Sequence, residues 1–212
     1  MEQQAVHVFV FDTLADWEPG YAMAGINDPE SQLRPGRYRV ETFGLSNAPV
    51  TTTGGLKLLP DRALDEVDPQ RSAMLILPGG QAWDVGRNME VVPLARRFLE
   101  AGVPVAAICG ATAGLARGGL LDDRRHTSNA ADYLQATGYK GAALYRDEPF
   151  VSDRDVITAA GTRPVDFAYA IFQRLEIYAP AVLEAWRGLF KTGDPKYFEA
   201  LMAASAQGGS AG

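Results

Sequence analysis

The most informative segment of the chain is Val105-Ala106-Ala107-Ile108-Cys109-Gly110-Ala111-Thr112-Ala113-Gly114. Its first half is apolar, which predicts a buried strand, and its second half consists of small residues that suit the start of a helix. A sharp strand-to-helix turn lifts a side chain above the sheet edge, where free backbone N–H groups and the helix dipole favour a thiolate. We therefore predict a nucleophile elbow at Cys109, the only cysteine of the chain. The alternative is that Cys109 is a small buried apolar residue.

Strands and helices alternate on both sides of this segment. Apolar or alternating runs predict strands at residues 6–11, 38–43, 74–77 and 156–160, and helical spacing predicts helices at 21–26, 91–101 and 164–175. Short connections between such elements indicate an α/β domain with a mainly parallel sheet and helices on both faces. One or two further helices are expected between 181 and 204, interrupted at Gly193-Asp194-Pro195, with a frayed tail from Gln207 to Gly212.

Length and composition limit the classes of function. A chain of 212 residues suits a single domain, and a net charge of −6 without a basic run argues against nucleic acid or an anionic membrane as a partner. A lone cysteine excludes an intrachain disulfide, which fits a reducing compartment. The first residues carry Glu2 and no Lys or Arg, and no apolar run approaches the roughly eighteen residues of a membrane span. We expect a soluble cytoplasmic protein.

Three loops are expected to meet at the carboxyl ends of the parallel strands, where ligands bind in open α/β sheets. These loops are residues 12–20, Pro78-Gly79-Gly80 and Cys109-Gly110. The first supplies Asp16 and Glu18. A carboxyl group beside a thiolate in a partly desolvated pocket tends to stay protonated and can donate a hydrogen bond to the sulfur. The alternative is that both carboxylates stabilise the first turn of the next helix.

Backbone donors and a base complete the candidate site. The amides of Gly79, Gly80 and Gly110 are candidate oxyanion donors, although glycines in these positions also suit tight turns. Of the two histidines, His7 is expected to be structural, because it lies at the beginning of the first strand. His126 follows the elbow helix in a polar stretch, and it is either a base or an ordinary surface residue.

The remaining signals concern ligands. Trp17, Trp83 and Tyr21 are candidates for the wall of an apolar substrate pocket, with core or dimer packing as the alternative. Asp16 is a further candidate for this pocket. The sequence has no Cys/His cluster with metal-ligand spacing and no phosphate-binding Gly-Lys pattern. We therefore expect a small-molecule substrate and neither a metal nor a cofactor.

Five motifs in order resemble the ThiJ/PfpI superfamily of class I glutamine amidotransferase-like proteins. The resemblance covers residues from about 5 to 178 and is carried by Asp16-Trp17-Glu18, the run from Leu75 to Gly80, Ala107 to Thr112, Gly119 to Asn129, and Ile157 to Thr162 leading into Pro164 to Ala168.

This resemblance implies a flavodoxin-like, doubly wound sheet, usually assembled as a homodimer. It also implies that Cys109 is the reactive elbow cysteine and that Glu18 is the protonated acid hydrogen-bonded to it. Residues 1–178 would form the family domain. Residues 179–212 would add a helical extension and a flexible tail to the same domain, as a lid or a dimer contact.

Departures from the family pattern narrow the chemistry. Peptidase-like members place a histidine directly after the cysteine, where this chain has Gly110, and true glutaminases carry a His-x-Glu pair that is absent after His126. Isonitrile hydratases have Asp at the position of Glu18 and Thr after the cysteine, so the chain does not match that group either. Peptidase and glutaminase activities are therefore disfavoured.

Two functions and a third alternative follow. The first is a cysteine-dependent hydrolase, hydratase or amidotransferase-like enzyme in which the Cys109 thiolate adds to a small electrophile. The second is a redox-sensing or stress-protective protein that uses oxidation of Cys109 without turnover. The third is a binding fold that has lost its chemistry.

Overall fold

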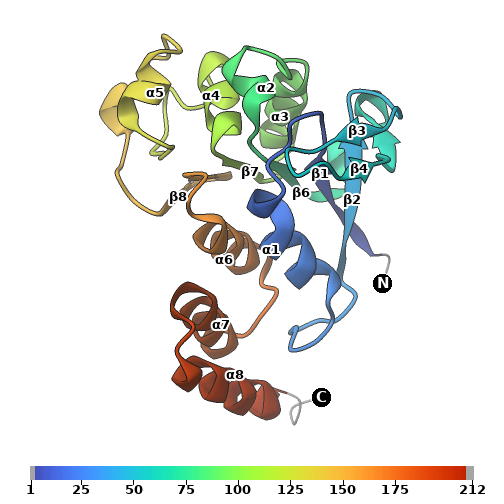
Figure 1. Ribbon diagram of the computed structural model, residues 1–212, viewed down its shortest axis with the longest axis vertical. Coiled ribbons are helices and arrows are strands. Elements are labelled where there is room, and N and C mark those ends of the chain that lie inside the picture. Colours follow the sequence, from blue (N-terminus) through green and yellow to red (C-terminus); the bar gives the residue numbers. More distant parts are fainter. Residues whose placement is uncertain (1–2, 209–212) are drawn as a thin grey trace.

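The computed structural model describes residues 3–208 and shows a seven-stranded sheet between two layers of helices (Figure 1). The strand order is β5-β2-β1-β6-β7-β9-β8, and each neighbouring pair is parallel except β8 with β9. The bounds are Gln4–Phe9 for β1, Tyr38–Gly44 for β2, Arg62–Ala63 for β5, Ser72–Leu77 for β6, Val105–Ile108 for β7, Phe150–Asp153 for β8 and Val156–Ala159 for β9. The predicted doubly wound α/β fold is confirmed.

Helices cover both faces of the sheet, as expected from right-handed crossovers. One face carries α1 (Trp17–Asn27), α6 (Pro164–Leu175) and α7 (Pro180–Thr192), and the other carries α2 (Gln81–Asp84), α3 (Val91–Glu100) and α4 (Gly110–Arg117). The remaining elements are the hairpin of β3 (Val50–Thr51) and β4 (Lys57–Leu58), helices α5 (Ala131–Gln135) and α8 (Pro195–Gly208), and the 3₁₀ turns η1 (Leu64–Glu66), η2 (Pro69–Arg71) and η3 (Ala142–Leu144).

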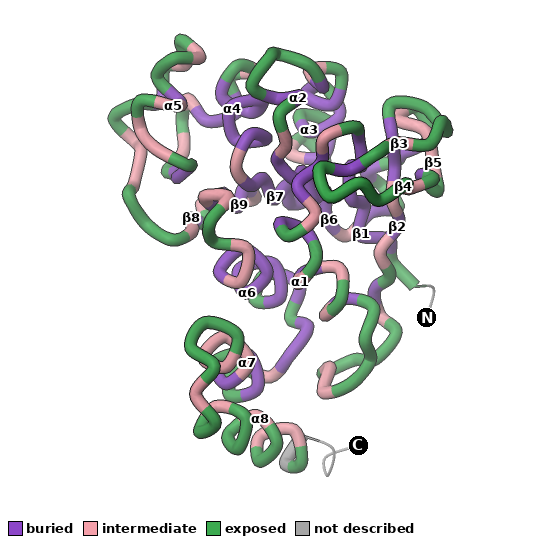
Figure 2. Tube along the Cα trace, in the orientation of Figure 1, coloured by how far each residue is buried: buried purple, intermediate pink, exposed green. Residues whose placement is uncertain are grey.

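Alternation along the central strands creates two cores, one on each face. In β6, Met74 and Ile76 pack with α1 and α6, whereas Leu75 and Leu77 pack towards α3 and α4. All four side chains are fully buried, and each contributes roughly 1.5–3 kcal/mol to the stability of the fold. The strands therefore form the buried centre of the molecule (Figure 2), and their carboxyl ends become a rigid platform for the loops above them.

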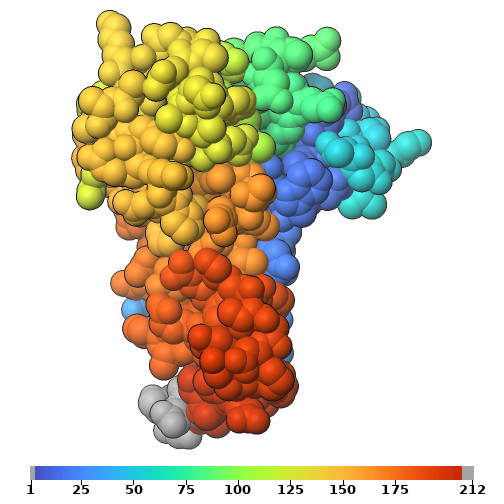
Figure 3. Space-filling model, turned by 60° about the vertical axis from the view of Figure 1, so that its left-hand side comes forward, coloured from blue at the N-terminus to red at the C-terminus, as the bar shows by residue number. Residues whose placement is uncertain are grey.

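The C-terminal helices extend the molecule away from the sheet (Figures 1 and 3). Helix α7 is tied to the α1–α6 face by Trp186, whose ring contacts Tyr21 and Phe172. Helix α8 packs on α7, and the Ser31 and Ser205 hydroxyls are 2.8 Å apart. The break between α7 and α8 falls at the predicted glycine and proline. The frayed tail was predicted from Gln207, but α8 includes Gln207 and Gly208; the rest of that prediction, residues 209–212, lies outside the described residues.

Short elements were absent from the prediction. The edge strand β8 has only four residues, two of them polar, and β3, β4 and β5 have two residues each. Such pieces carry too few residues to show a periodicity of two. In the described part of the chain, none of the helices has the length and apolar character needed to cross a membrane.

Candidate functional site

Cys109 occupies a strained elbow between β7 and α4. Its backbone has φ 58° and ψ −125°, although it is not a glycine, and α4 begins at the next residue. A positive φ is unfavourable for a residue with a Cβ and persists only where neighbours hold it in place. The Cys109 N–H donates to the Ala159 carbonyl at 3.0 Å, and its carbonyl accepts from the Thr112 hydroxyl at 2.6 Å. The predicted strand–turn–helix geometry is therefore present, and hydrogen bonds to β9 and α4 fix it.

Two glycines form walls beside the sulfur. A Cβ on Gly79 would lie 2.6 Å from the Cys109 Cβ and 2.7 Å from Glu18 Oε2, and a Cβ on Gly161 would lie 2.8 Å from the Cys109 Sγ. Neither position has room for any side chain. The role of Gly79 thus differs from that of a simple turn residue, because its missing side chain allows the thiol and the carboxyl group to approach each other.

Glu18 lies in the first turn of α1 and is fully buried. Its Oε2 accepts a hydrogen bond of 2.6 Å from the Gly79 N–H, so the carboxyl group reaches the loop after β6 rather than stabilising its own helix. Its Oε1 is buried without a well-aligned hydrogen bond, and the Cys109 thiol is the nearby polar group facing it. The structure thus brings together the predicted acid and thiol.

Burial dominates the titration of this pair. It raises the pKa of Glu18 to about 7, against the opposing effect of the Gly79 hydrogen bond. Burial, followed by the charge of Glu18, raises the pKa of Cys109 to about 11. The pair therefore holds one proton and one negative charge between these two values. The carboxylate with a thiol and the acid with a thiolate are the two forms of this singly protonated pair. The shifts favour the first form, and the second, which the sequence suggested, stays a prediction. Transfer of the thiol proton to Glu18 Oε1 converts one form into the other.

Asn129 is the site residue that the sequence reasoning missed. Its Nδ2 donates to the Cys109 Sγ at 3.3 Å, and its Oδ1 accepts from the Gly161 N–H at 2.9 Å. The Gly161 bond fixes the orientation of the amide, so the NH₂ group faces the sulfur. This contact lowers the pKa of Cys109 and opposes the effect of burial. The available signal was the polar run Thr127-Ser128-Asn129, of which the first two residues are buried.

His126 is not brought to the sulfur. Its ring is fully buried, its Nδ1 lies 2.8 Å from the Arg124 carbonyl, and its Nε2 lies 2.9 Å from the Tyr139 hydroxyl. Burial lowers the pKa of His126, which keeps the ring neutral. Both ring nitrogens are occupied, so His126 is not placed to act as a base for Cys109. The polar sequence around His126 suggested a loop that brings the imidazole to the site. The imidazole instead holds this loop in place through Arg124 and Tyr139.

The three glycines predicted as oxyanion donors differ in what they contact. The Gly79 N–H is already bound to Glu18, whereas the Gly110 N–H interacts with the Cys109 sulfur. Gly80 is extended and bridges to Leu14. The donors that face the sulfur are therefore the Gly110 amide and the Asn129 side chain.

The pocket residues predicted from the sequence also separate. Trp17 is half-exposed beside the thiol, and its Nε1 donates to the Gly161 carbonyl at 3.3 Å. Trp83 is fully buried in the core and donates to the Pro78 carbonyl. Asp16 accepts a hydrogen bond of 2.6 Å from Gly54 and ties α1 to the β3–β4 hairpin. Of these three residues, Trp17 lines the pocket and the other two support its surroundings.

The pocket above the thiol is open and shallow, with a volume of about 510 Å³. It is mostly apolar, and its lining contains no Lys, Arg or His; it consists of Trp17, Glu18, Cys109, Asn129, Gly161, Thr162 and Pro164. Within residues 3–208, His, Cys, Asp and Glu side chains do not gather in threes as a metal site requires. The arrangement can perform nucleophilic addition, with the proton passing between sulfur and carboxyl oxygen.

Comparison with known proteins places this geometry in context. The DJ-1/PfpI family model matches residues 4–174. The uncharacterized protease YoaZ of Bacillus subtilis is 39% identical over 95% of this chain and 98% of its own length. The crystal structure of a thiJ/pfpI family protein from Bacillus anthracis superposes with a TM-score of 0.89 at 38% identity, covering 96% of this chain and 98% of that one. The deglycase PfpI of Pyrococcus furiosus is 33% identical over 101 residues, which are 47% of this chain and 61% of that protein.

Proposed function

The chain belongs to the DJ-1/PfpI family, and from this premise we propose that it is a cofactor-independent cysteine enzyme in which Cys109 adds to the electrophilic carbon of a small substrate. The observation that carries the proposal is the Cys109–Glu18 pair. A thiol on a strained backbone and a fully buried carboxyl group share one apolar pocket, with Gly79 and Gly161 beside them. Perturbed titratable groups that face each other in a pocket are typical of catalytic sites.

The first step proposed for an aldehyde substrate, the addition of Cys109, needs only groups of the chain. The Glu18 carboxylate takes the thiol proton, and the sulfur forms a bond to the carbonyl carbon. The π electrons of the carbonyl move to its oxygen, which the Gly110 amide and the Asn129 amide stabilise by hydrogen bonds. Glu18 then returns the proton to that oxygen, which gives a hemithioacetal and restores the carboxylate.

An amide substrate would follow the same first step. The leaving amine would depart with the proton from Glu18, and water would then hydrolyse the thioester. The names of the relatives, protease YoaZ and deglycase PfpI, suggest amide or glycated-amine substrates for those proteins. The shallow pocket of about 510 Å³ favours small molecules over folded proteins here.

The test compares wild type with Cys109→Ala on α-oxoaldehydes, short amides, isonitriles, glycated amines and a peptide. We expect turnover of at least one small electrophile by wild type and a rate indistinguishable from the uncatalysed background in the variant. Thermal melting of both forms checks that the variant is folded. Equal activity of the two folded proteins on every substrate would overturn the proposal.

One observation favours a second candidate, a redox-sensing or stress-protective role. Cys109 is half-buried, and its sulfur faces the Asn129 amide and the Gly110 amide, which suit the oxygens of a sulfinate. Two molecules of hydrogen peroxide would convert the thiol to sulfinic acid with release of two waters. Intact-mass measurement after mild peroxide tests this role. It requires a stable gain of two oxygens on Cys109 and predicts none in Cys109→Ala.

We further propose that the protein acts in the cytoplasm as a homodimer. The lone cysteine suits a reducing compartment, and Phe190, Phe198 and Met202 on α7 and α8 are about half exposed. Such apolar side chains on adjacent helices suit a contact between copies. Light scattering on the purified protein would measure the mass directly, and a monomer at micromolar concentration would contradict the dimer.

A further inference from the structure

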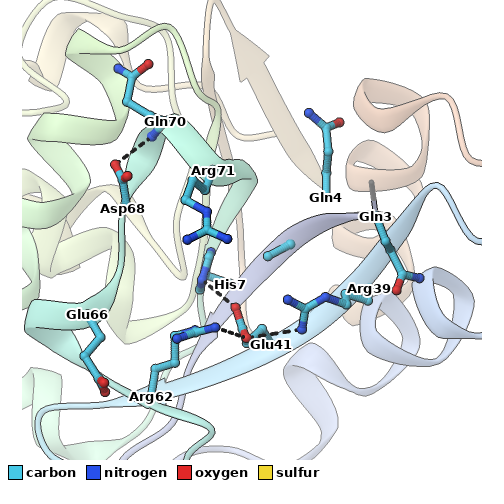
Figure 4. A pocket seen from close by; sticks show the side chains of 11 residues that line it. Gln3, Gln4, His7, Arg39, Glu41, Arg62, Glu66, Asp68, Gln70 and Arg71 are labelled. Carbon is cyan, nitrogen blue, oxygen red and sulfur yellow. Dashed lines mark hydrogen bonds and ion pairs between the residues drawn. The ribbon is translucent and has the colours of Figure 1, made fainter. Parts of the chain in front are cut away.

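A second pocket, with a volume of about 350 Å³, opens at the amino ends of β1, β2 and β6, whereas Cys109 lies at the carboxyl ends (Figure 4). Its floor is the pair His7 on β1 and Glu41 on β2, which are register partners and almost fully buried. Arginines from three different elements surround this pair, namely Arg39 on β2, Arg62 on β5 and Arg71 at the end of η2.

The buried carboxylate at the floor is fully compensated. Glu41 Oε2 lies 3.1 Å from His7 Nε2, and Glu41 Oε1 lies 2.9 Å from Arg62 Nη2 and 3.1 Å from Arg39 Nη1. The hydrogen bonds and charges of Arg62 and Arg39 outweigh burial and lower the pKa of Glu41. Glu41 is therefore ionised at neutral pH, and each arginine uses only part of its five N–H donors on it.

Arg71 contributes a further guanidinium group. Among the described residues 3–208, its side chain has no hydrogen bond or ion pair, and Figure 4 shows it extending towards His7. Arginine presents its donors in a planar fork that matches phosphate and carboxylate oxygens. The pocket thus contains one guanidinium group without a partner and two with donors to spare.

The two other carboxylates of the pocket are turned to backbone amides. Glu66 Oε2 accepts from the Ala63 N–H at 2.8 Å, and Asp68 Oδ1 accepts from the Gln70 N–H at 3.0 Å. Together with Glu41 they balance the charges of the three arginines, so long-range attraction of an anion is weak. Recognition in this pocket must therefore depend on directional hydrogen bonds, and these call for a ligand that supplies acceptors.

The neighbouring serine does not make this pocket a second catalytic site. Ser72 Oγ lies 3.0 Å from His7 Nδ1, which superficially resembles a Ser–His–Glu triad. Its hydroxyl proton, however, is donated to the Asp68 carbonyl at 2.7 Å. The oxygen is fixed as a support for the imidazole, and the pocket is suited to binding.

We propose that this pocket binds the phosphate group of a small metabolite, or free inorganic phosphate, through Arg39, Arg62 and Arg71. Three guanidinium groups suit a dianion with several acceptor oxygens better than a monocarboxylate. The volume of about 350 Å³ exceeds that of phosphate and leaves room for a small organic part beside the amides of Gln4 and Gln70.

Titration calorimetry at low ionic strength tests this with inorganic phosphate, glucose 6-phosphate and glucose. We expect both phosphates to bind, glucose to give no heat, and Arg71→Gln to weaken binding roughly tenfold to a hundredfold, as expected for loss of a charged hydrogen bond. The Arg71 side chain has no partner within the described residues, so the variant is expected to keep its fold.

The matched control is Arg87→Gln, which removes one exposed arginine outside the pocket and should leave binding unchanged. Binding of inorganic phosphate alone would support a site for the free anion. Absence of heat with both phosphates would overturn the proposal. An equal loss in Arg71→Gln and Arg87→Gln would also overturn it, because the attraction would then be nonspecific.

Discussion

Glu18 and Glu41 are both buried carboxyl groups on the same sheet architecture, yet their surroundings are opposite. Glu41 has two arginines and a histidine within 3.1 Å, and these partners lower its pKa. Glu18 has one backbone N–H and the Cys109 thiol, with no cation in its pocket, and burial raises its pKa to about 7. The comparison indicates that Glu41 is stabilised as an ion, whereas Glu18 is able to exchange a proton near neutral pH.

The same contrast extends to the backbone. At Cys109 the backbone has a positive φ although the residue is not glycine. Gly79 and Gly161 are required beside it, because a Cβ at either position would clash with the Cys109 side chain. His7 and Glu41, in contrast, are ordinary register partners in adjacent strands. The strained backbone of Cys109 and the unpartnered Oε1 of Glu18 thus lie at one site, which is typical of a reactive site.

The largest effect is expected from Glu18→Gln on turnover of whichever electrophile of the test panel wild type converts. Glutamine keeps an oxygen for the Gly79 N–H but cannot exchange a proton with Cys109, so kcat/KM should fall roughly 10²- to 10⁴-fold. In wild type, kcat/KM should rise with pH through about 7, as Glu18 becomes a base, and the variant should lose this rise. Measurement of kcat/KM between pH 5.5 and about 8.5 checks both points.

The matched control for this measurement is Glu41→Gln, which makes the same chemical change in the other carboxyl group. It should leave kcat/KM and its pH profile unchanged, because Glu41 does not line the Cys109 pocket. If the two variants lost activity to the same extent, the assignment of proton transfer to Glu18 would fail.

The pH dependence of stability is the second prediction, and it is smaller. The pKa of Glu18 rises from 4.5 in the unfolded chain to about 7 in the fold, so the folded state binds more protons in this interval. Wild-type stability should therefore fall as pH rises from 4.5 to 7, by roughly 3 kcal/mol from this group. Glu18→Gln should lack that loss and be the more stable protein above pH 7.

Denaturant unfolding at several pH values measures this difference directly. The free energy of unfolding of Glu18→Gln should exceed that of wild type at pH 8, and the two should approach each other near pH 5. A variant that is less stable than wild type at pH 8 would show that the buried carboxylate has a stabilising partner.

The long elements could be predicted because periodicity and turn residues agree with the final packing. The helix at 164–175 has its predicted bounds, and Gly102 follows α3 with φ 72°. The elbow at Cys109 could be predicted from the apolar run that ends there and the small residues that follow it. The edge strand β8 and the β3–β4 hairpin were not, because their few residues depend on tertiary contacts.

The site was only partly visible for a related reason. Sequence order indicates which loops reach the carboxyl ends of the strands, and it brought Glu18 and Cys109 together. It does not indicate side-chain direction within a loop. His126 and Asn129 lie three residues apart in one polar run, yet one is bound to Tyr139 and the other to the sulfur. The choice depends on partners from distant segments, among them Gly161.

Glu41→Gln has the smallest expected effect on the free energy of unfolding. It gives the sharpest contrast, because it should destabilise the protein, whereas Glu18→Gln should stabilise it above pH 7. The change removes the charge that pairs with Arg39 and Arg62, whose side chains are 44% and 38% exposed and regain water. We expect a loss of about 1–2 kcal/mol in the free energy of unfolding at pH 7.

The lowered pKa of Glu41 means that wild type holds this stabilisation above pH 4.5 and loses it as pH falls through the folded value. Denaturant unfolding at pH 7 and near pH 4 should therefore show the gap between wild type and variant closing with acid, whereas the gap for Glu18→Gln opens with base. Two glutamine variants with the same sign of effect at pH 8 would show that the two carboxyl groups do not differ as their partners indicate.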